Sequence, residues 1–298
     1  MMRYFALLLL FLAASGIVQA KTIHYILSSE ARVVGQAVND IQSQLVQPDV
    51  PINHKTTLVN QFSSADVAPD DLLVAIGNKA AKAVIDRGHS NQTIIGFTDT
   101  QTNAYIQKNR QHARLSVISL NQSAQRLVTF SDVIAKTSYK KALLVAVSEQ
   151  NKALISELDA LAPLAHGKLK VIIIPKGTLA AKVLEPDLFD AAALIALQDN
   201  AIWTGKNAKW LLQQAFNYKV PVVGYSKSFL KAGALASVYS SLDDVANSTA
   251  QVINTWLDGT ARKQFAIIYP EATIQINPSI ARVYKSAAES LNGQGKVK

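Results

Sequence analysis

The chain has 298 residues and no cysteine, and its 30 lysines and arginines against 21 aspartates and glutamates give a formal net charge of +9. Without cysteine it has no disulfide, zinc–thiolate site or cysteine nucleophile, so we expect its stability to come from a hydrophobic core. The basic residues are scattered and form no stripe interleaved with aromatics, which excludes an obvious nucleic-acid-binding surface.

The first twenty residues predict a cleavable signal peptide. Arg3 gives a positive start, residues 6–14 form an apolar run, and Val18-Gln19-Ala20 is a small-x-small cleavage site. The run is shorter than the roughly 18 apolar residues that span a bilayer. We therefore expect an exported, periplasmic protein whose mature chain begins at about Lys21.

After this leader, apolar strand-like runs alternate with amphipathic helix-like segments, which is typical of a parallel α/β sheet. Several of the runs are apolar on both faces, as expected for strands covered by helices on both sides. The predicted strands are residues 22–28, 71–77, 93–97, 141–148, 168–175, 191–197 and 220–225. Helix-like segments between them include residues 31–46, 78–88, 123–137 and 207–219.

One strand–helix series ends in polar residues near 115–121, and a second series follows. We therefore predict an α/β protein with two Rossmann-like lobes, parallel sheets and a cleft between the lobes. The tail after residue 239 contains further strand-like and helix-like pieces, which indicates a hinge with several crossovers. We assign residues 21–118 and 240–272 to the first lobe and residues 119–239 and 273–298 to the second.

Hydrogen-bonding side chains follow the predicted strands, at the edge where α/β sheets bind their ligands. Most of these groups do not titrate near neutrality, which suits recognition of a small polar solute better than acid–base catalysis. Serine, threonine, aspartate and asparagine after a strand are also ordinary helix caps, so the prediction rests on the set as a whole. Two tyrosines of the set could stack on a flat ligand group or close the lobe interface. The candidate ligand-binding residues are Ser28, Ser29, Asn78, Lys79, Thr98, Asp99, Ser148, Glu149, Asp199, Asn200, Tyr225 and Tyr239.

One short motif raises a catalytic alternative. Ser228 and Lys231 form an S-x-x-K, the spacing at which a lysine amine can deprotonate a serine. The K-T-G motif that accompanies it in penicillin-binding enzymes is absent, and the five histidines form no metal-binding pair. We expect no enzyme activity, metal or cofactor, and keep an exported serine acyl-transferase as the less favoured alternative. The acidic pair Asp243-Asp244 is interpreted as capping charge at a helix start.

Four segments, residues 69–84, 193–202, 220–259 and 272–284, resemble a known family. The most specific features are Pro221, Gly233-Ala234-Leu235-Ala236, Asp244, Leu257-Asp258-Gly259 and Ile276-Asn277, which occur in the family's order. The chain thus resembles the ABC transporter substrate-binding proteins, a family that includes aromatic amino acid binders.

The resemblance implies a fold like that of type I periplasmic binding proteins, a small-molecule ligand and, as partner, an inner-membrane ABC permease. A membrane signalling receptor is the alternative partner, and we expect a monomer that binds no nucleic acid. By the same resemblance, a charged end of the ligand would lie near Asn78 and Lys79. Asp199 and Asn200 would contact it from the other lobe. Residues 242–246 depart from the family pattern of paired tyrosines and a glycine, so the solute itself is not carried over.

Overall fold

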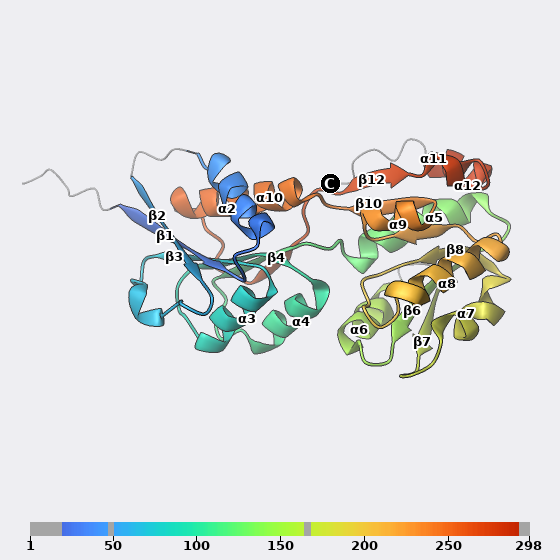
Figure 1. The fold of residues 1–298 in the computed structure, drawn as a ribbon, viewed down its shortest axis with the longest axis horizontal. Coiled ribbons are helices and arrows are strands. Elements are labelled where there is room, and N and C mark those ends of the chain that lie inside the picture. Colours follow the sequence, from blue (N-terminus) through green and yellow to red (C-terminus); the bar gives the residue numbers. More distant parts are fainter. Residues whose placement is uncertain (1–19, 47–50, 164–167, 292–298) are drawn as a thin grey trace, which may run out of the picture.

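The computed structural model describes residues 20–46, 51–163 and 168–291, which form two α/β lobes side by side (Figure 1). The predicted signal peptide lies outside these residues apart from its last position, Ala20. None of the described helices combines the length and apolar character needed to cross a membrane.

The first lobe is built on a six-stranded parallel sheet with the strand order β11-β5-β4-β3-β1-β2. Helices α2 and α10 pack on one face, and α3 and α4 cover the other (Figure 1). The strands are β1 (Lys21–Leu27), β2 (Ile52–Leu58), β3 (Leu72–Ile76), β4 (Thr93–Thr98), β5 (Leu115–Ser119) and β11 (Ala266–Ile268). The helices are α2 (Arg32–Ser43), α3 (Asn78–Arg87), α4 (Thr100–Asn109), α10 (Leu242–Leu257) and the short 3-10 helix η1 (Ser64–Asp66).

The second lobe has the order β12-β10-β9-β8-β6-β7, with β12 antiparallel to β10 and the other pairs parallel. Helices α5, α6 and α12 pack on one face, and α7, α8 and α9 on the other. The strands are β6 (Ala142–Ser148), β7 (Leu169–Ile174), β8 (Ala191–Ile195), β9 (Val222–Gly224), β10 (Ala236–Tyr239) and β12 (Thr273–Ile276). The helices are α5 (Ala124–Thr137), α6 (Lys152–Leu161), α7 (Ala180–Leu188), α8 (Gly205–Asn217), α9 (Lys227–Ala232), α11 (Pro278–Ala281) and α12 (Lys285–Leu291).

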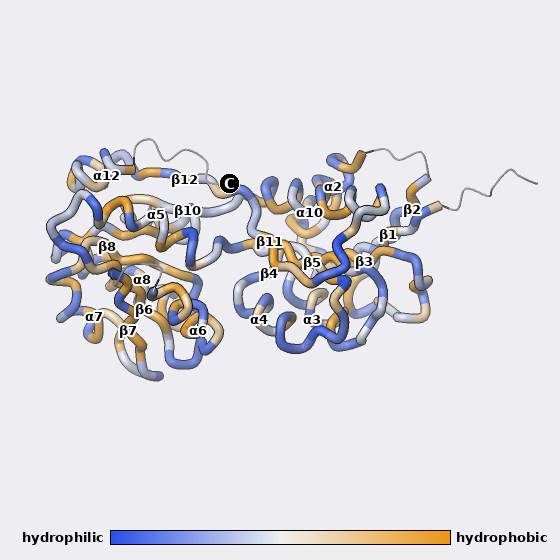
Figure 2. The backbone as a smooth tube through the Cα atoms, turned by 180° about the vertical axis from the view of Figure 1, so that it is seen from behind, coloured by the Kyte–Doolittle hydropathy of each residue, from blue (hydrophilic) through white to orange (hydrophobic). Residues whose placement is uncertain are grey.

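The central strands are strongly apolar, and Figure 2 shows them inside both lobes. Every residue of β3, β5 and β8 is buried, because helices cover both faces of each sheet. Strand β2 was absent from the predicted runs. It is an edge strand with mostly exposed side chains, so its polar sequence lacks the apolar signal of the central strands.

Within the described residues the chain crosses between the lobes at three places: from β5 to α5, from β10 to α10 and from β11 to β12. The second crossover ends in a capping box, in which Oγ of Ser241 accepts from the Asp244 N–H and the Asp244 carboxylate accepts from the Ser241 N–H. Asp244 therefore caps α10, and Asp243 lies in the first turn, where its charge favours the helix dipole. The lobe boundaries drawn from the sequence stay a prediction.

Candidate functional site

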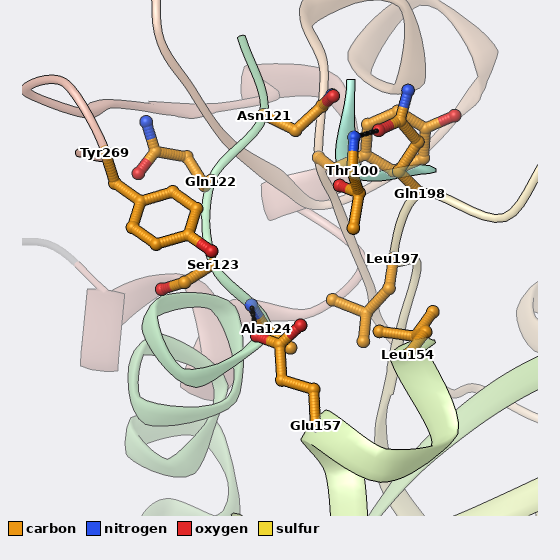
Figure 3. Close-up of a pocket in the computed structure, with 11 residues that line it drawn as sticks. Thr100, Asn121, Gln122, Ser123, Ala124, Leu154, Glu157, Leu197, Gln198 and Tyr269 are labelled. Carbon is orange, nitrogen blue, oxygen red and sulfur yellow. Dashed lines mark hydrogen bonds between the residues drawn. The ribbon is translucent and has the colours of Figure 1, made fainter. Parts of the chain in front are cut away.

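A narrow cavity of about 10 Å³, roughly the room that one water molecule needs, lies where the lobes meet and is partly open to solvent (Figure 3). The Thr100 N–H, at the start of α4, donates a 3.1 Å hydrogen bond to Oε1 of Gln198 beyond β8. This bond joins one wall of the cavity to the other across the lobes. The lining residues are Thr100, Asn121, Gln122, Ser123, Ala124, Leu154, Glu157, Leu197, Gln198, Tyr225 and Tyr269.

The direction of the parallel strands explains why these residues meet. Thr100 follows β4, residues 121–124 follow β5, and residues 197–198 follow β8, so all three segments leave the carboxyl ends of strands. Tyr269 reaches the same place from the crossover between β11 and β12. The cavity therefore occupies the position at which α/β sheets bind ligands.

The three crossovers are hydrogen-bonded to one another beside the cavity. The amide of Gln122 donates to Oγ of Ser240 and to the Pro270 carbonyl, the latter at 3.3 Å. Nη1 of Arg126 donates to the same Pro270 carbonyl at 2.8 Å and to Oε1 of Gln122. One side chain from each of two crossovers and a carbonyl of the third thus form one network. A rotation of the lobes about these segments must therefore change the backbone or the hydrogen bonds in or next to this network.

Asn121 places a polar atom without a partner at the cavity wall (Figure 3). The residue is 9% exposed, and Oδ1 has no hydrogen-bond partner among the described residues. A buried polar atom left unpaired costs about 1–3 kcal/mol. A solute that donated a hydrogen bond to Oδ1 would recover this energy on binding.

Glu157 supplies the carboxylate of the cavity. Its Oε1 accepts from the Ala124 N–H at 3.0 Å, at the start of α5. Burial raises the pKa of Glu157, and the hydrogen bond from Ala124 opposes that shift only in part. Burial and then the negative charge of Glu157 raise the pKa of Tyr269 to about 12, while Arg126 acts in the opposite direction. The lining residues comprise one carboxylate and no basic side chain, and the guanidinium of Arg126 lies beside them, bonded to Gln122.

Two predicted residues of the first lobe, Asn78 and Asp99, are bonded to each other. Nδ2 of Asn78 donates to Oδ2 of Asp99 at 2.7 Å, and the Asp99 N–H donates to Oδ1 of Asn78 at 3.1 Å. Oδ1 of Asp99 also caps α4 by accepting from the Thr102 N–H at 2.8 Å. These groups hold the start of α3 against the start of α4. They position Thr100, which does line the cavity.

The other predicted residues of the first lobe differ in their surroundings. Oγ of Ser28 accepts a 2.9 Å hydrogen bond from the backbone at the start of α3. Thr98 is fully buried and donates to Oδ1 of Asn103 at 2.6 Å. Ser29 and Lys79 are exposed. The structure therefore engages Ser28 and Thr98 in the packing of the lobe and leaves Ser29 and Lys79 at its surface.

Asp199 is the most fully satisfied of the predicted residues in the second lobe. It is 1% exposed, and its Oδ2 accepts from the N–H and Oγ of Ser148 at 2.8 Å each and from Nδ2 of Asn151 at 3.3 Å. Its Oδ1 accepts from the Ala201 N–H at 3.0 Å. The carboxylate thus ties the loop after β8 to the end of β6 and the start of α6.

The remaining predicted residues are spread along the second lobe. Oε1 of Glu149 accepts from the Lys176 N–H at 2.9 Å, and Asn200 is exposed. The Tyr239 hydroxyl donates to Gln275 across β10 and β12 at 3.0 Å. Tyr225 lines the cavity, with its ring 5.0 Å from that of Phe229 between centroids. Of the twelve predicted residues, Tyr225 alone is among those that line the cavity within the described structure. The set as a ligand site stays a prediction.

Sequence reasoning missed several lining residues. Residues 121–123 carried a visible signal, because the strand-like run before them ends in polar side chains. Glu157 and Tyr269 carried none. Glu157 lies within α6 rather than at a strand end, and Tyr269 lies on a crossover, so only the packing of the lobes brings them to the cavity.

The catalytic alternative finds little support in the geometry. Ser228 and Lys231 are both exposed on the short helix α9, and Oγ of Ser228 lies 2.7 Å from Oγ of Ser226. No group of three or more histidine, aspartate or glutamate side chains that could hold a metal ion occurs among the described residues.

Two α/β lobes with mostly parallel sheets, connected by three crossovers, define the fold of type I periplasmic binding proteins, as predicted. A family described as ABC transporter substrate binding protein matches residues 38–285. The chain belongs to this family, which confirms the resemblance drawn from its sequence. Membership implies a small-molecule ligand and an ABC transporter permease as partner, and the family is a class of substrate-binding rather than enzymatic proteins.

Solved structures share the fold at low sequence identity. A ligand-free, open substrate-binding protein with adhesive properties from Clostridium difficile has a TM-score of 0.65 and 15% identity, covering 89% of this chain and 95% of its own. An ABC domain from Streptococcus pneumonia in complex with L-Trp has a TM-score of 0.57 and 16% identity, covering 93% and 99%. A conserved domain protein from Vibrio cholerae has a TM-score of 0.54 and 16% identity, covering 92% and 95%. No curated protein matches the chain significantly.

Proposed function

We propose that this protein captures a small polar solute in the interlobe cavity and delivers it to an ABC importer. The observation that carries the proposal is the composition of the cavity wall, which comes from both lobes and from the crossovers between them. A solute held there touches both lobes only when they are together. It therefore stabilises the closed arrangement by its differential affinity for that arrangement.

We further propose that the solute carries a protonated amine. Glu157 is the one carboxylate among the lining residues, and the unpartnered Oδ1 of Asn121 requires a hydrogen-bond donor. The rings of Tyr225 and Tyr269 and the side chains on α6 and beyond β8 offer apolar surface for the rest of a small organic molecule. An amino acid or another small amine meets these requirements.

We place this activity in the periplasm, after export through the predicted signal peptide. Family membership is consistent with a site of action outside the cytoplasm. The solute bound to the Streptococcus pneumonia neighbour, L-Trp, carries an amine and an aromatic ring. It belongs in the first panel of compounds to be tested.

A thermal-shift screen against amino acids, other small amines, nucleosides, short peptides and organic acids tests the proposal. A ligand that binds only the folded form at about 100 times its Kd stabilises it by about 2.7 kcal/mol. We expect amines to raise Tm and organic acids without an amine to leave it unchanged. If no class of solute raises Tm, solute capture by this cavity is wrong.

A matched pair of variants on α6 tests the role of the carboxylate. Glu157→Gln keeps an oxygen for the Ala124 N–H but removes the charge, and should weaken binding of the amine about 10-fold or more, the value of one charge-assisted hydrogen bond. Asp159→Asn, at an exposed position of the same helix, should leave Kd unchanged. Equal affinity in both variants would remove Glu157 from the site while leaving solute capture intact.

Deletion of the gene tests delivery to an importer. We expect the strain to lose uptake of the solute identified in the screen and to regain it when the gene is restored. If the purified protein binds the solute but uptake is unaffected, import is wrong and a signalling receptor becomes the partner to pursue.

A further inference from the structure

A second hollow lies on the second lobe, at the opposite end of its sheet from the interlobe cavity. It is a groove of about 570 Å³, open to solvent, where the segments before β6 and β9 and the start of β8 meet the turn between α11 and α12. Helix α12 lies at the end of this lobe remote from the first lobe (Figures 1 and 2). Solutes of α/β sheets bind at the carboxyl ends of strands, so a groove at the amino ends requires another explanation.

The side chains around this groove are strongly basic. Lys140, Lys219, Arg282 and Lys285 line it, and the described lining includes no carboxylate. None of the four takes part in a salt bridge found among the described residues. Even when Asp190, beside the groove in sequence, is counted, a clear positive excess remains. We call the groove and the side chains flanking it the basic end.

Large apolar side chains are exposed at the basic end. Tyr139 is 89% exposed and Val283 is 54% exposed, and both line the groove. Phe189, 75% exposed, lies under Nζ of Lys140 at 5.8 Å from the ring centroid. Soluble proteins rarely keep such side chains together in water unless a partner covers them.

We propose that the basic end docks on the surface of an anionic phospholipid bilayer. Anionic bilayer surfaces attract lysine and arginine, and aromatic side chains lie at the level of the headgroups. The basic end combines both kinds of side chain. The cations lie on long stems and make no ion pair within the described structure, which suits mobile headgroups. A second copy of the chain is disfavoured as the occupant, because each copy has a net charge of +9.

Docking at this position leaves the interlobe cavity free. The groove lies at the amino ends of strands of the second sheet, whereas the cavity lies beyond the carboxyl ends of strands of both sheets. A bilayer on the basic end therefore does not obstruct the cavity. The proposal is independent of the identity of the solute and of the importer.

Vesicle co-sedimentation tests the proposal. The chain is taken from Lys21, where β1 begins, so that the apolar leader does not itself bind lipid and every described strand and helix is retained. We expect binding to phosphatidylcholine vesicles that contain about 30 mol % phosphatidylglycerol, weaker binding in high salt, and none to phosphatidylcholine alone.

Two triple variants with the same change in net charge separate local docking from general attraction. Replacing Lys219, Arg282 and Lys285 by glutamine should weaken vesicle binding about 100-fold, at roughly fivefold for each cation near the surface. Replacing Lys55, Arg262 and Lys263, which are exposed away from the groove, by glutamine should weaken it only a few-fold. Thermal unfolding checks that both variants are folded.

The apolar part of the contact has its own variant. Tyr139→Ser together with Phe189→Ser should lower vesicle binding several-fold at unchanged net charge, and the loss should persist in high salt. Equal losses in the two triple variants, equal binding to both kinds of vesicle, or equally tight binding of the wild type to soluble poly-glutamate would each overturn the bilayer proposal.

Discussion

Removal of the Asp199 carboxylate separates a structural role of this residue from a role in ligand binding. The resemblance to substrate-binding proteins suggested a ligand contact here, whereas the structure gives both oxygens partners within the second lobe. Asp199→Ala would leave four donors unpaired, from Ser148, Asn151 and Ala201, at a site where the side chain is 1% exposed. The variant is expected to unfold more easily.

The size of the effect follows from the four hydrogen bonds. Removing one partner of a buried charged network costs about 3–5 kcal/mol, less than the sum of its bonds because the loop relaxes. For a chain of this size each kcal/mol lowers Tm by about 2–4 °C, so the expected loss is roughly 6–20 °C. Asp199→Asn keeps one oxygen and should lose about 1–2 kcal/mol, since a neutral amide replaces the carboxylate.

Urea unfolding followed by circular dichroism measures these differences, with Asn200→Ala as the control. Asn200 is exposed and adjacent, so its truncation should change the free energy of unfolding by less than about 0.5 kcal/mol. A loss below about 1 kcal/mol for Asp199→Ala would refute the structural role. A stable Asp199→Ala variant that no longer binds solute would instead return the residue to the ligand site.

Three further predictions follow from local geometry. Gly224→Ala should destabilise the protein by about 1–3 kcal/mol, because the new Cβ would lie 2.3 Å from Cβ of Phe229. Gly35→Ala, on an open face of α2, should stabilise it by about 0.5–1 kcal/mol. Thermal melts of both variants measure these changes, and equal effects would contradict the packing around Gly224. Burial raises the pKa of Glu157 in the folded state above its value of about 4.3 in the unfolded state. The folded state therefore binds the proton of Glu157 more readily, and the free energy of unfolding rises as the pH falls through the folded-state pKa. Any stability advantage of Glu157→Gln at pH 7 should therefore shrink toward pH 4.5 in urea unfolding, and an advantage that grows would reverse the sign. Ser228→Ala should bind solute as the wild type does, and neither protein should be covalently labelled by a β-lactam; labelling of the wild type alone would revive the acyl-transferase alternative.

The sequence determined the fold class. The alternation of apolar runs with amphipathic segments can be read from short stretches of the chain. Strands that are apolar on both faces, such as β3 and β8, are typical of a parallel sheet covered by helices on both sides. The family was equally accessible, because all but one of its most specific motifs lie in one stretch of the chain, residues 220–259, and the last follows at residues 276–277. Strand β2 was missed for the converse reason, since an exposed edge strand carries little apolar signal.

Only the tertiary structure decided which polar side chains face the cavity. Asp99 and Asp199 both follow strands, but each accepts hydrogen bonds from neighbours in its own lobe. No local sequence pattern indicates these partners. Glu157 and Tyr269 reach the cavity because a helix and a crossover, more than a hundred residues apart, pack against the same strand ends. Sequence periodicity specifies which face of an element is buried, but the partners of a polar group depend on distances that arise only when the elements assemble.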